Sequence, residues 1–192
     1  GSKTKGSIYS TMITKLTIFT YENYAKMTAE NDIDLLDIGF GEKPYAIFIS
    51  TPDYDKSSFF IASVFIRQLY YVLAQHCTIN TNDGKCKREV VFLLDEFGNL
   101  PPIENFATIM TVCLGRNIRF NLVAQSDAQI EKNYGKEAET IIGNCGNQYF
   151  LSSGDLQTVE HFSKQLGNET FKNVSRSGEK MSLNKSFTEN YE

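Results

Sequence analysis

The sequence predicts an α/β fold, with a mainly parallel sheet and helices on both of its faces. Two observations lead to this prediction. Apolar runs of strand length alternate along the chain with longer stretches whose apolar residues recur at helical spacing. The first two of these runs, at residues 45–51 and 90–94, are hydrophobic on both faces, which is typical of parallel strands covered on two sides. Parallel strands that alternate with helices are joined by right-handed crossovers.

The length and composition agree with one globular domain or one domain with a tail. The chain has 192 residues, of which 41% are hydrophobic and 22% charged, and its formal net charge is −4. This composition excludes a wholly disordered chain, a collagen and a coiled coil, and the net charge argues against a strongly basic nucleic-acid clamp. No apolar run approaches the roughly 20 residues that span a bilayer. The four cysteines form no C-x-x-C pair, so we interpret them as reduced thiols of a cytosolic protein.

The first half of the chain predicts a strand between two helices. Residues 7–20 place apolar side chains at helical spacing. Residues 45–51, with the sequence YAIFIST, follow Lys43-Pro44 and form the first predicted strand. A long apolar stripe over residues 55–76 then predicts a helix.

The second half continues the same alternation. Further strands are expected at residues 90–94, 118–124 and 148–152. Helices are expected at residues 103–114, 127–133, 136–143 and 155–166, with a break at Tyr134-Gly135 and with Asp155 as the cap of the last helix.

The chain also divides by composition. We interpret Gly1-Ser2 as a cloning remnant and residues 3–167 as part of one domain. Residues 168–192 are rich in Ser, Asn, Lys and Glu and have little periodic hydrophobicity, so they are expected to be a loose tail.

Two acids follow directly after the second predicted strand. Asp95 and Glu96 end the apolar run 90–94, which is the Walker B pattern of nucleotide-binding proteins. A buried strand holds the carboxylates rigidly, so that Asp95 can hold a Mg²⁺-bound water and Glu96 can polarise the water that attacks a γ-phosphate. The alternative is a strand end with two solvated acids.

Two more side chains join this hypothesis through the third predicted strand. Gln125 follows that strand, and it reaches the same rim as Glu96 if the two strands are neighbours, where an amide can sense a γ-phosphate. The alternative is that this segment only caps the next helix. Arg116 precedes the strand, at the opposite end, so it could serve only a neighbouring subunit, as an arginine finger. The alternative is an ordinary surface arginine.

The segment Leu93-Leu-Asp-Glu-Phe-Gly-Asn-Leu-Pro101 resembles the Walker B block of the TraG/TraD-type coupling proteins of conjugative type IV secretion. Weaker matches extend over roughly residues 6–167. The resemblance implies a partial RecA-like P-loop NTPase fold, with Asp95 as the magnesium acid, Glu96 as the catalytic acid, Gln125 as the sensor and Arg116 as the inter-subunit arginine. It implies ATP and Mg²⁺ as cofactors.

The resemblance also implies a biological setting. Such a protein is a homo-hexameric motor that drives DNA and its relaxase to the secretion channel in bacterial conjugation, and its partners are DNA, the relaxosome and channel subunits. The chain would be a cytoplasmic domain of a protein that N-terminal helices attach to the cell membrane. Two alternatives stay open, an FtsK/HerA-like DNA translocase fragment and a non-enzymatic docking module for relaxosome and channel proteins.

One expected motif is missing. The sequence has no Gly-x-x-x-x-Gly-Lys-Ser/Thr, the Walker A loop whose backbone N–H groups and lysine cradle phosphates. We therefore expect the chain to be the C-terminal part of a motor domain, and to bind ATP weakly or not at all by itself.

Overall fold

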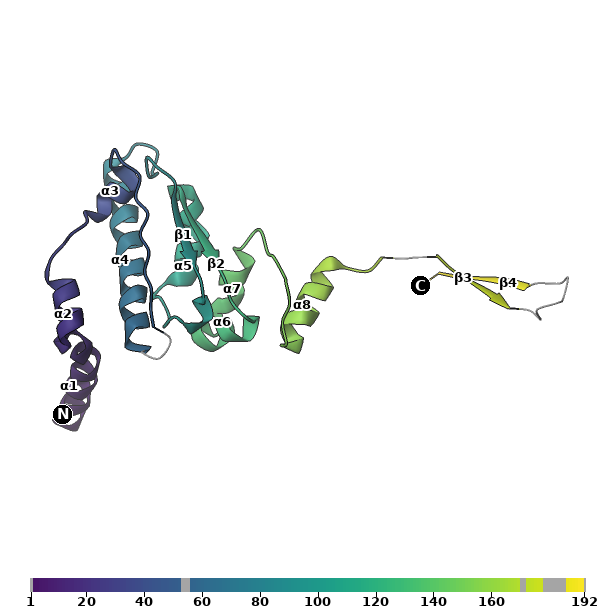
Figure 1. Cartoon of the computed structure of the whole chain (residues 1–192), viewed down its shortest axis with the longest axis horizontal. Coiled ribbons are helices and arrows are strands. Elements are labelled where there is room, and N and C mark those ends of the chain that lie inside the picture. The colour runs from purple at the N-terminus through teal and green to yellow at the C-terminus, as the bar shows by residue number, and fades with distance from the viewer. Residues whose placement is uncertain (1, 53–55, 170–171, 178–185, 192) are drawn as a thin grey trace. The chain divides into compact units, whose positions relative to one another are not determined.

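The structure is a computed structural model that describes residues 2–52, 56–169, 172–177 and 186–191. The chain forms two compact units, Gly1–Gln148 and Tyr149–Glu192 (Figure 1).

The first unit begins with helices. The N-terminal elements are α1 (Ser2–Leu16), the short 3-10 helix η1 (Thr17–Thr20), α2 (Glu22–Ala29), α3 (Leu35–Phe40) and the long α4 (Lys56–Asn80). Asp34 starts α3, because its carboxylate accepts a hydrogen bond of 2.9 Å from the N–H of Leu36. The predicted helix over residues 55–76 corresponds to α4, and the one over residues 7–20 corresponds to α1 with η1.

A two-stranded parallel sheet lies at the centre of this unit. β1 (Val90–Leu94) pairs with β2 (Ile118–Leu122), with Leu94 opposite Leu122. The pairing continues past the strands, because the N–H of Val123 donates to the carbonyl of Leu94 at 3.0 Å. The second and third predicted strands and their parallel direction are therefore confirmed.

Short helices connect and follow the two strands. Between them come η2 (Phe97–Asn99), α5 (Phe106–Val112) and η3 (Cys113–Arg116), and after them α6 (Asp127–Tyr134) and α7 (Glu137–Gly143). The predicted break between the last two helices is confirmed. It lies at Gly135, whose φ of 56° is a conformation that glycine adopts without steric cost.

One hydrophobic core joins α4, both strands, α5, α6 and α7. Its centre is aromatic. The ring of Phe106 lies 5.1 Å from that of Phe97, 5.3 Å from that of Phe120 and 5.9 Å from that of Tyr134. Phe97 and Phe106 are fully buried. Phe97 is also the third residue after β1, so the core anchors the turn that carries the two predicted acids.

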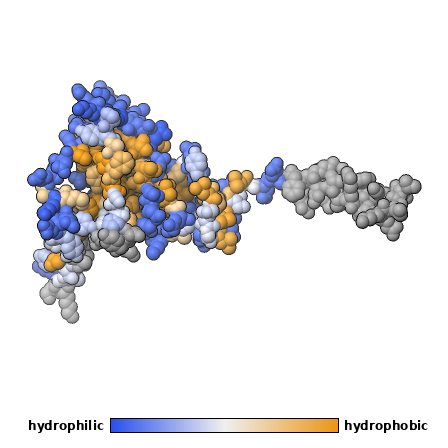
Figure 2. All heavy atoms as spheres, viewed as in Figure 1, coloured by the Kyte–Doolittle hydropathy of each residue, from blue (hydrophilic) through white to orange (hydrophobic). Residues whose placement is uncertain are grey.

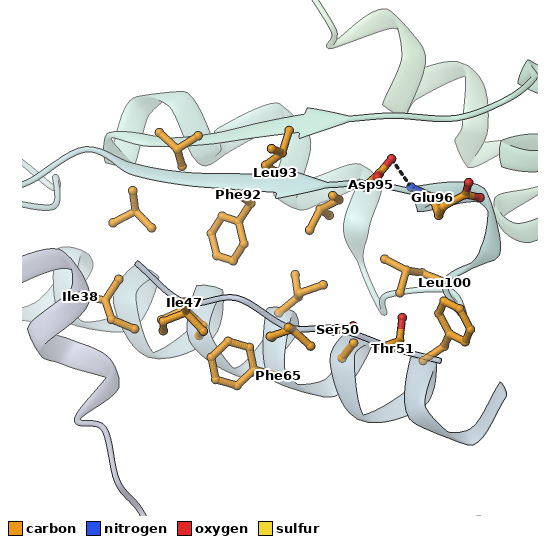
Figure 3. Close-up of a pocket in the computed structure, with 18 of the residues that line it drawn as sticks. Ile38, Ile47, Ser50, Thr51, Phe65, Phe92, Leu93, Asp95, Glu96 and Leu100 are labelled. Carbon is orange, nitrogen blue, oxygen red and sulfur yellow. Dashed lines mark hydrogen bonds between the residues drawn. The ribbon is translucent and has the colours of Figure 1, made fainter. Parts of the chain in front are cut away.

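The prediction of a strand at residues 45–51 is wrong. The segment is extended and runs opposite β1 (Figure 3), but it has no strand partner among the described residues. A cavity lined by both segments separates them, so their backbone groups do not form a ladder. Ile47 packs against the core while Phe48 is 93% exposed. The segment is therefore covered on one face only.

The prediction of a strand at residues 148–152 is also wrong. Gln148 is held at the end of α7, where its Nε2 donates to the carbonyl of Ile142 at 3.2 Å. Tyr149 and Leu151 are 90% and 96% exposed, and no strand pairs with them in the described part of the chain. An apolar run becomes a strand only where a second backbone lies beside it.

These two differences change the fold class. In place of a mainly parallel sheet with helices on both faces, the chain is a mixed α/β protein with mostly helices and a small two-stranded parallel sheet. On β1, Val91 and Leu93 are 54% and 72% exposed, so the outer face of the sheet is open. Figure 2 shows apolar side chains gathered on the surface between α4 and β1.

The second unit contains a helix and a hairpin. α8 (Leu156–Leu166) begins at Asp155, whose carboxylate accepts from the N–H of Thr158 at 3.0 Å, so the predicted cap is confirmed. β3 (Lys172–Ser177) and β4 (Ser186–Tyr191) then pair antiparallel. Residues 168–192, expected to be a loose tail, thus contain paired strands, because backbone pairing does not require the apolar periodicity on which the prediction relied. The division of the chain into domains stays a prediction.

Candidate active site

The turn after β1 fixes the two predicted acids. Oδ1 of Asp95 accepts a hydrogen bond of 3.0 Å from the N–H of Glu96. Glu96 has a φ of 52°, a left-handed conformation that costs a non-glycine residue on the order of 1 kcal/mol. Nδ2 of Asn99 donates to Oε2 of Glu96 at 2.7 Å. The acid is therefore held both by its turn and by a neighbouring side chain.

Gln125 reaches the same edge of the sheet. The N–H of Val123 donates to Leu94, and the carbonyl of Val123 accepts from the N–H of Phe97 at 2.9 Å. The chain that leaves β2 thus runs directly beside the turn that leaves β1. Asp95, Glu96 and Gln125 all line one cavity.

This cavity has a volume of about 680 Å³ and lies between β1 and residues 45–51. Along most of its length it is apolar, and Figure 3 shows the side chains of Ile47 and Phe92 beside it. At the carboxyl end of β1 its lining becomes polar. The polar residues there are Ser50, Thr51, Asp95, Glu96, Asn99 and Gln125.

The polar end suits one half of a magnesium–nucleotide site. Carboxylate and hydroxyl oxygens are the hard ligands that Mg²⁺ and its bound waters prefer. Among the described residues no three His, Cys, Asp or Glu side chains lie close enough together to hold a metal ion. A Mg²⁺ ion beside Asp95 would therefore keep most of its ligands as water or phosphate oxygens.

The same cavity does not supply the phosphate half. Of the described residues that line it, the single cation is Arg88, before the opposite end of β1. The guanidinium of Arg88 already donates to the carbonyls of Gly41, Glu42 and Lys43, at 3.1, 3.2 and 2.9 Å. The described residues thus fit the acids and the amide of a nucleotide site, but they offer no cradle for a triphosphate.

Arg116 lies apart from the other three predicted site residues. It precedes β2, whose five residues span about 16 Å, whereas Gln125 follows that strand. Its Nη1 donates to the carbonyl of Ala74 at 2.9 Å and to Oγ1 of Thr78 at 2.8 Å. Within this chain Arg116 therefore ties η3 to α4, and its role toward a neighbouring subunit stays a prediction.

Comparison with known proteins identifies the family of this chain. A family model described as type IV secretory system conjugative DNA transfer matches residues 1–192. The chain belongs to this family. The match confirms the resemblance that the Walker B block indicated, and it extends over the whole chain.

The chain is also similar in sequence to individual proteins of conjugative DNA transfer. Protein VirD4 of Agrobacterium fabrum is 36% identical over 96 residues, which is 49% of this chain and 14% of that protein. Conjugal transfer protein TraG of Escherichia coli is 24% identical over 171 residues, or 86% of this chain and 27% of its own length. The coupling protein VirD4 of Bartonella quintana is 25% identical over 174 residues, or 88% and 25%. The chain thus spans about a quarter or less of these relatives.

Membrane attachment is not tested by the described part of the chain. Among the residues that the structure describes, no helix is both long and apolar enough to cross a bilayer. Attachment to the cell membrane by other helices of a longer protein therefore stays a prediction for this family member.

Sequence reasoning missed two polar side chains beside the predicted site. Asn99 holds Glu96, as described above. Gln129, on α6, accepts from the N–H of Gln125 at 3.3 Å and donates through Nε2 to Oε1 of Gln125 at 3.4 Å. The spacing of three or four residues is visible in the sequence, but it is also the ordinary spacing of neighbours on any helical turn.

Proposed function

We propose that this chain supplies the acid-bearing part of the ATPase motor of a conjugative coupling protein. One observation carries the proposal: Asp95, Glu96 and Gln125 line the same end of one cavity, beside the carboxyl ends of two parallel strands. Ligands of open parallel sheets gather at this end of the strands. Family membership makes a nucleotide the ligand that fits best.

Each of the three side chains has a distinct role in this proposal. Bound MgATP supplies a phosphoanhydride bond whose hydrolysis releases energy. With Mg²⁺ bound, Asp95 would hold the ion through one of its waters, and Glu96 would orient the attacking water and accept its proton. Gln125 donates from its amide to an oxygen of the γ-phosphate without adding negative charge. Arg116 would act on the site of a neighbouring subunit in a homo-hexamer.

The phosphate cradle would come from residues outside this cavity lining. Backbone N–H groups and a lysine normally supply most of the binding energy for a triphosphate. Because the described lining contains no lysine and the 192-residue sequence has no Walker A loop, we expect the chain to bind ATP only weakly, and turnover to require the full-length protein.

The proposed motor moves DNA together with its relaxase. In this proposal the full-length protein contacts the relaxosome on one side and type IV secretion channel subunits on the other, at the cytoplasmic face of the cell membrane. The net charge of −4 does not exclude contact with DNA, because the lining of a ring pore is a small part of the surface.

The test is DNA-stimulated ATP turnover by the full-length protein, measured together with transfer frequency in mating. Glu96→Gln keeps the shape of the side chain but cannot accept a proton, so kcat should fall about 100-fold or more. Glu42→Gln, a change of the same kind at an exposed position, is the matched control. Turnover that survives Glu96→Gln would refute the proposal.

The two alternatives give different outcomes in the same experiments. An FtsK/HerA-like translocase would hydrolyse ATP with the same acid but without dependence on a relaxosome, and the family match favours the coupling proteins over it. A docking module would capture relaxosome or channel proteins equally well with and without nucleotide. It would also keep this binding in the Glu96→Gln variant.

A further inference from the structure

Gln129 lies between Gln125 and Gly98, which belongs to the turn after β1. Its side chain comes from α6 and ends at Gln125, with one carboxamide making both hydrogen bonds, to the backbone N–H and to Oε1. At 3.3 and 3.4 Å, both bonds are longer than the roughly 2.7–3.2 Å of a typical N–H···O hydrogen bond, so each is weak by itself. Their geometry is nevertheless specific, because a single planar amide has to satisfy a donor and an acceptor of the same residue.

Gly98 makes room for this side chain. A Cβ at Gly98 would overlap Oε1 of Gln129 and would lie 2.8 Å from its Cβ and 2.9 Å from its Cδ. The backbone of Gly98 does not need glycine, because the described glycines with positive φ are Gly84, Gly135 and Gly167. Space for Gln129 is therefore what position 98 provides.

A second residue of α6 also contacts the turn that carries the two acids. One helical turn after Gln129, Nδ2 of Asn133 donates to the carbonyl of Gly98 at 2.9 Å and to that of Leu100 at 3.2 Å. The turn that begins at Asp95 and the segment that ends at Gln125 are thus both held by the same helix.

We propose that Gln129 is the positioning residue of Gln125, and that Gly98 admits it. The inference rests on the proposed function. The two ends of the Gln125 amide differ chemically, and a donor from Gln129 fixes which end is the oxygen. The amide nitrogen of Gln125 then lies on the opposite side, as a donor for an anionic oxygen such as that of a phosphate. Glutamate at position 129 would keep the shape but place an acceptor against Oε1 of Gln125.

The first test measures ATP turnover by the full-length protein in a double-mutant cycle. Gln129→Glu should lower kcat about 10-fold with little change in KM, since outer partners of a site typically contribute this much. In a Gln125→Ala background the same change should have no further effect. The control is Gln157→Glu, an identical change at an exposed position of α8. Equal losses in both backgrounds, or no loss in either, would overturn the inference.

The second test needs no nucleotide and uses thermal unfolding of the 192-residue chain. Gly98→Ala should lower Tm by about 4 °C or more, because the new methyl group overlaps Gln129. In a Gln129→Ala background most of this loss should disappear. An equal loss in both backgrounds would refute the positioning contact. If turnover proves independent of Glu96, the proposed function fails, and this second cycle still decides whether Gln129 occupies the space at Gly98.

Discussion

Asn99 holds the carboxylate of Glu96 through a hydrogen bond of 2.7 Å between Nδ2 and Oε2. The bond joins two residues of one tight turn, and it is charge-assisted because the acceptor is a carboxylate. It fixes the direction of the proposed catalytic acid before any ligand is present.

Loss of this bond should lower the rate of ATP hydrolysis. In the full-length protein, Asn99→Ala lets the carboxylate of Glu96 rotate, so we expect kcat to fall about 3- to 10-fold with KM for ATP unchanged. In Asn99→Asp we expect kcat to fall further, because the new carboxylate repels that of Glu96. Asn31→Ala, at an exposed position after α2, is the control. An unchanged kcat in both Asn99 variants would show that the bond has no part in turnover.

The contact between Arg116 and α4 should be visible in stability. Arg116→Ala removes donors to the carbonyl of Ala74 and to Thr78, and we expect a loss of about 1–2 kcal/mol in the free energy of unfolding. Thr78→Val removes only the side-chain partner and should cost less. Urea denaturation of the 192-residue chain measures both changes, and a neutral effect of Arg116→Ala would argue against the contact.

The proposed arginine finger is tested separately by subunit mixing. If Arg116 serves a neighbouring site, inactive Arg116→Ala and Glu96→Gln subunits of the full-length protein should recover ATP turnover when mixed, because some interfaces then combine an intact Arg116 with an intact Glu96. No recovery would leave Arg116 with its structural role alone.

Two phenylalanines should differ strongly in their contribution to stability. Phe106 is fully buried among aromatic rings, so Phe106→Ala should cost about 3–5 kcal/mol. Phe48 is 93% exposed, so the same substitution there should change the free energy of unfolding by less than about 0.5 kcal/mol. A large loss in Phe48→Ala would mean that residues 45–51 are packed as a covered strand after all.

The thiol pair of Cys77 and Cys86 should weaken the fold at alkaline pH. The two Sγ atoms lie 3.5 Å apart in the core, and burial, with the neighbouring Cys77, raises the pKa of Cys86 from 9.0 to about 12. Between these values the unfolded chain loses the proton while the folded chain retains it. Stability should therefore be unaffected below pH 9 and should decline from pH 9 to 12.

Cys86→Ala should make this alkaline decline shallower. It should not abolish the decline, because burial also raises the pKa of the Tyr70 and Tyr134 hydroxyls. The measurement is the free energy of unfolding as a function of pH, compared by slope so that the cavity left by the substitution does not matter. The same slope in both proteins would contradict the assignment.

The cap of α8 should depend on acid pH. Hydrogen bonds from the hydroxyl and the N–H of Thr158 lower the pKa of Asp155 from its usual value of 3.8. The cap is therefore complete above that value and is lost as the pH falls through the lower pKa of the folded state. Asp155→Ala should fray the first turn of α8 at neutral pH, and Asp155→Asn should keep the turn without the acid transition. Hydrogen exchange of the Thr158 amide measures the effect of both substitutions. An unprotected Thr158 amide in the parent chain would refute the cap.

Local residue patterns were enough to predict most of the helices, the two strands of the parallel sheet and the edge at which chemistry is expected. The strands β1 and β2, the break at Gly135 and the cap at Asp155 depend on neighbouring residues, so local pattern and capping chemistry were sufficient to predict them. Parallel strands end at a common edge, which is why Asp95, Glu96 and Gln125 could be grouped before their positions were known.

The neighbours of each segment, in contrast, depend on how distant parts of the chain pack together. Residues 45–51 and 148–152 each contain an apolar run of strand length, yet no second backbone pairs with them among the described residues, and a strand is defined by that partner. Arg116 bonds to Ala74, 42 residues away, and Gln129 occupies the space above Gly98. Such contacts depend on how separate elements pack in space, and no local pattern of residues records that packing.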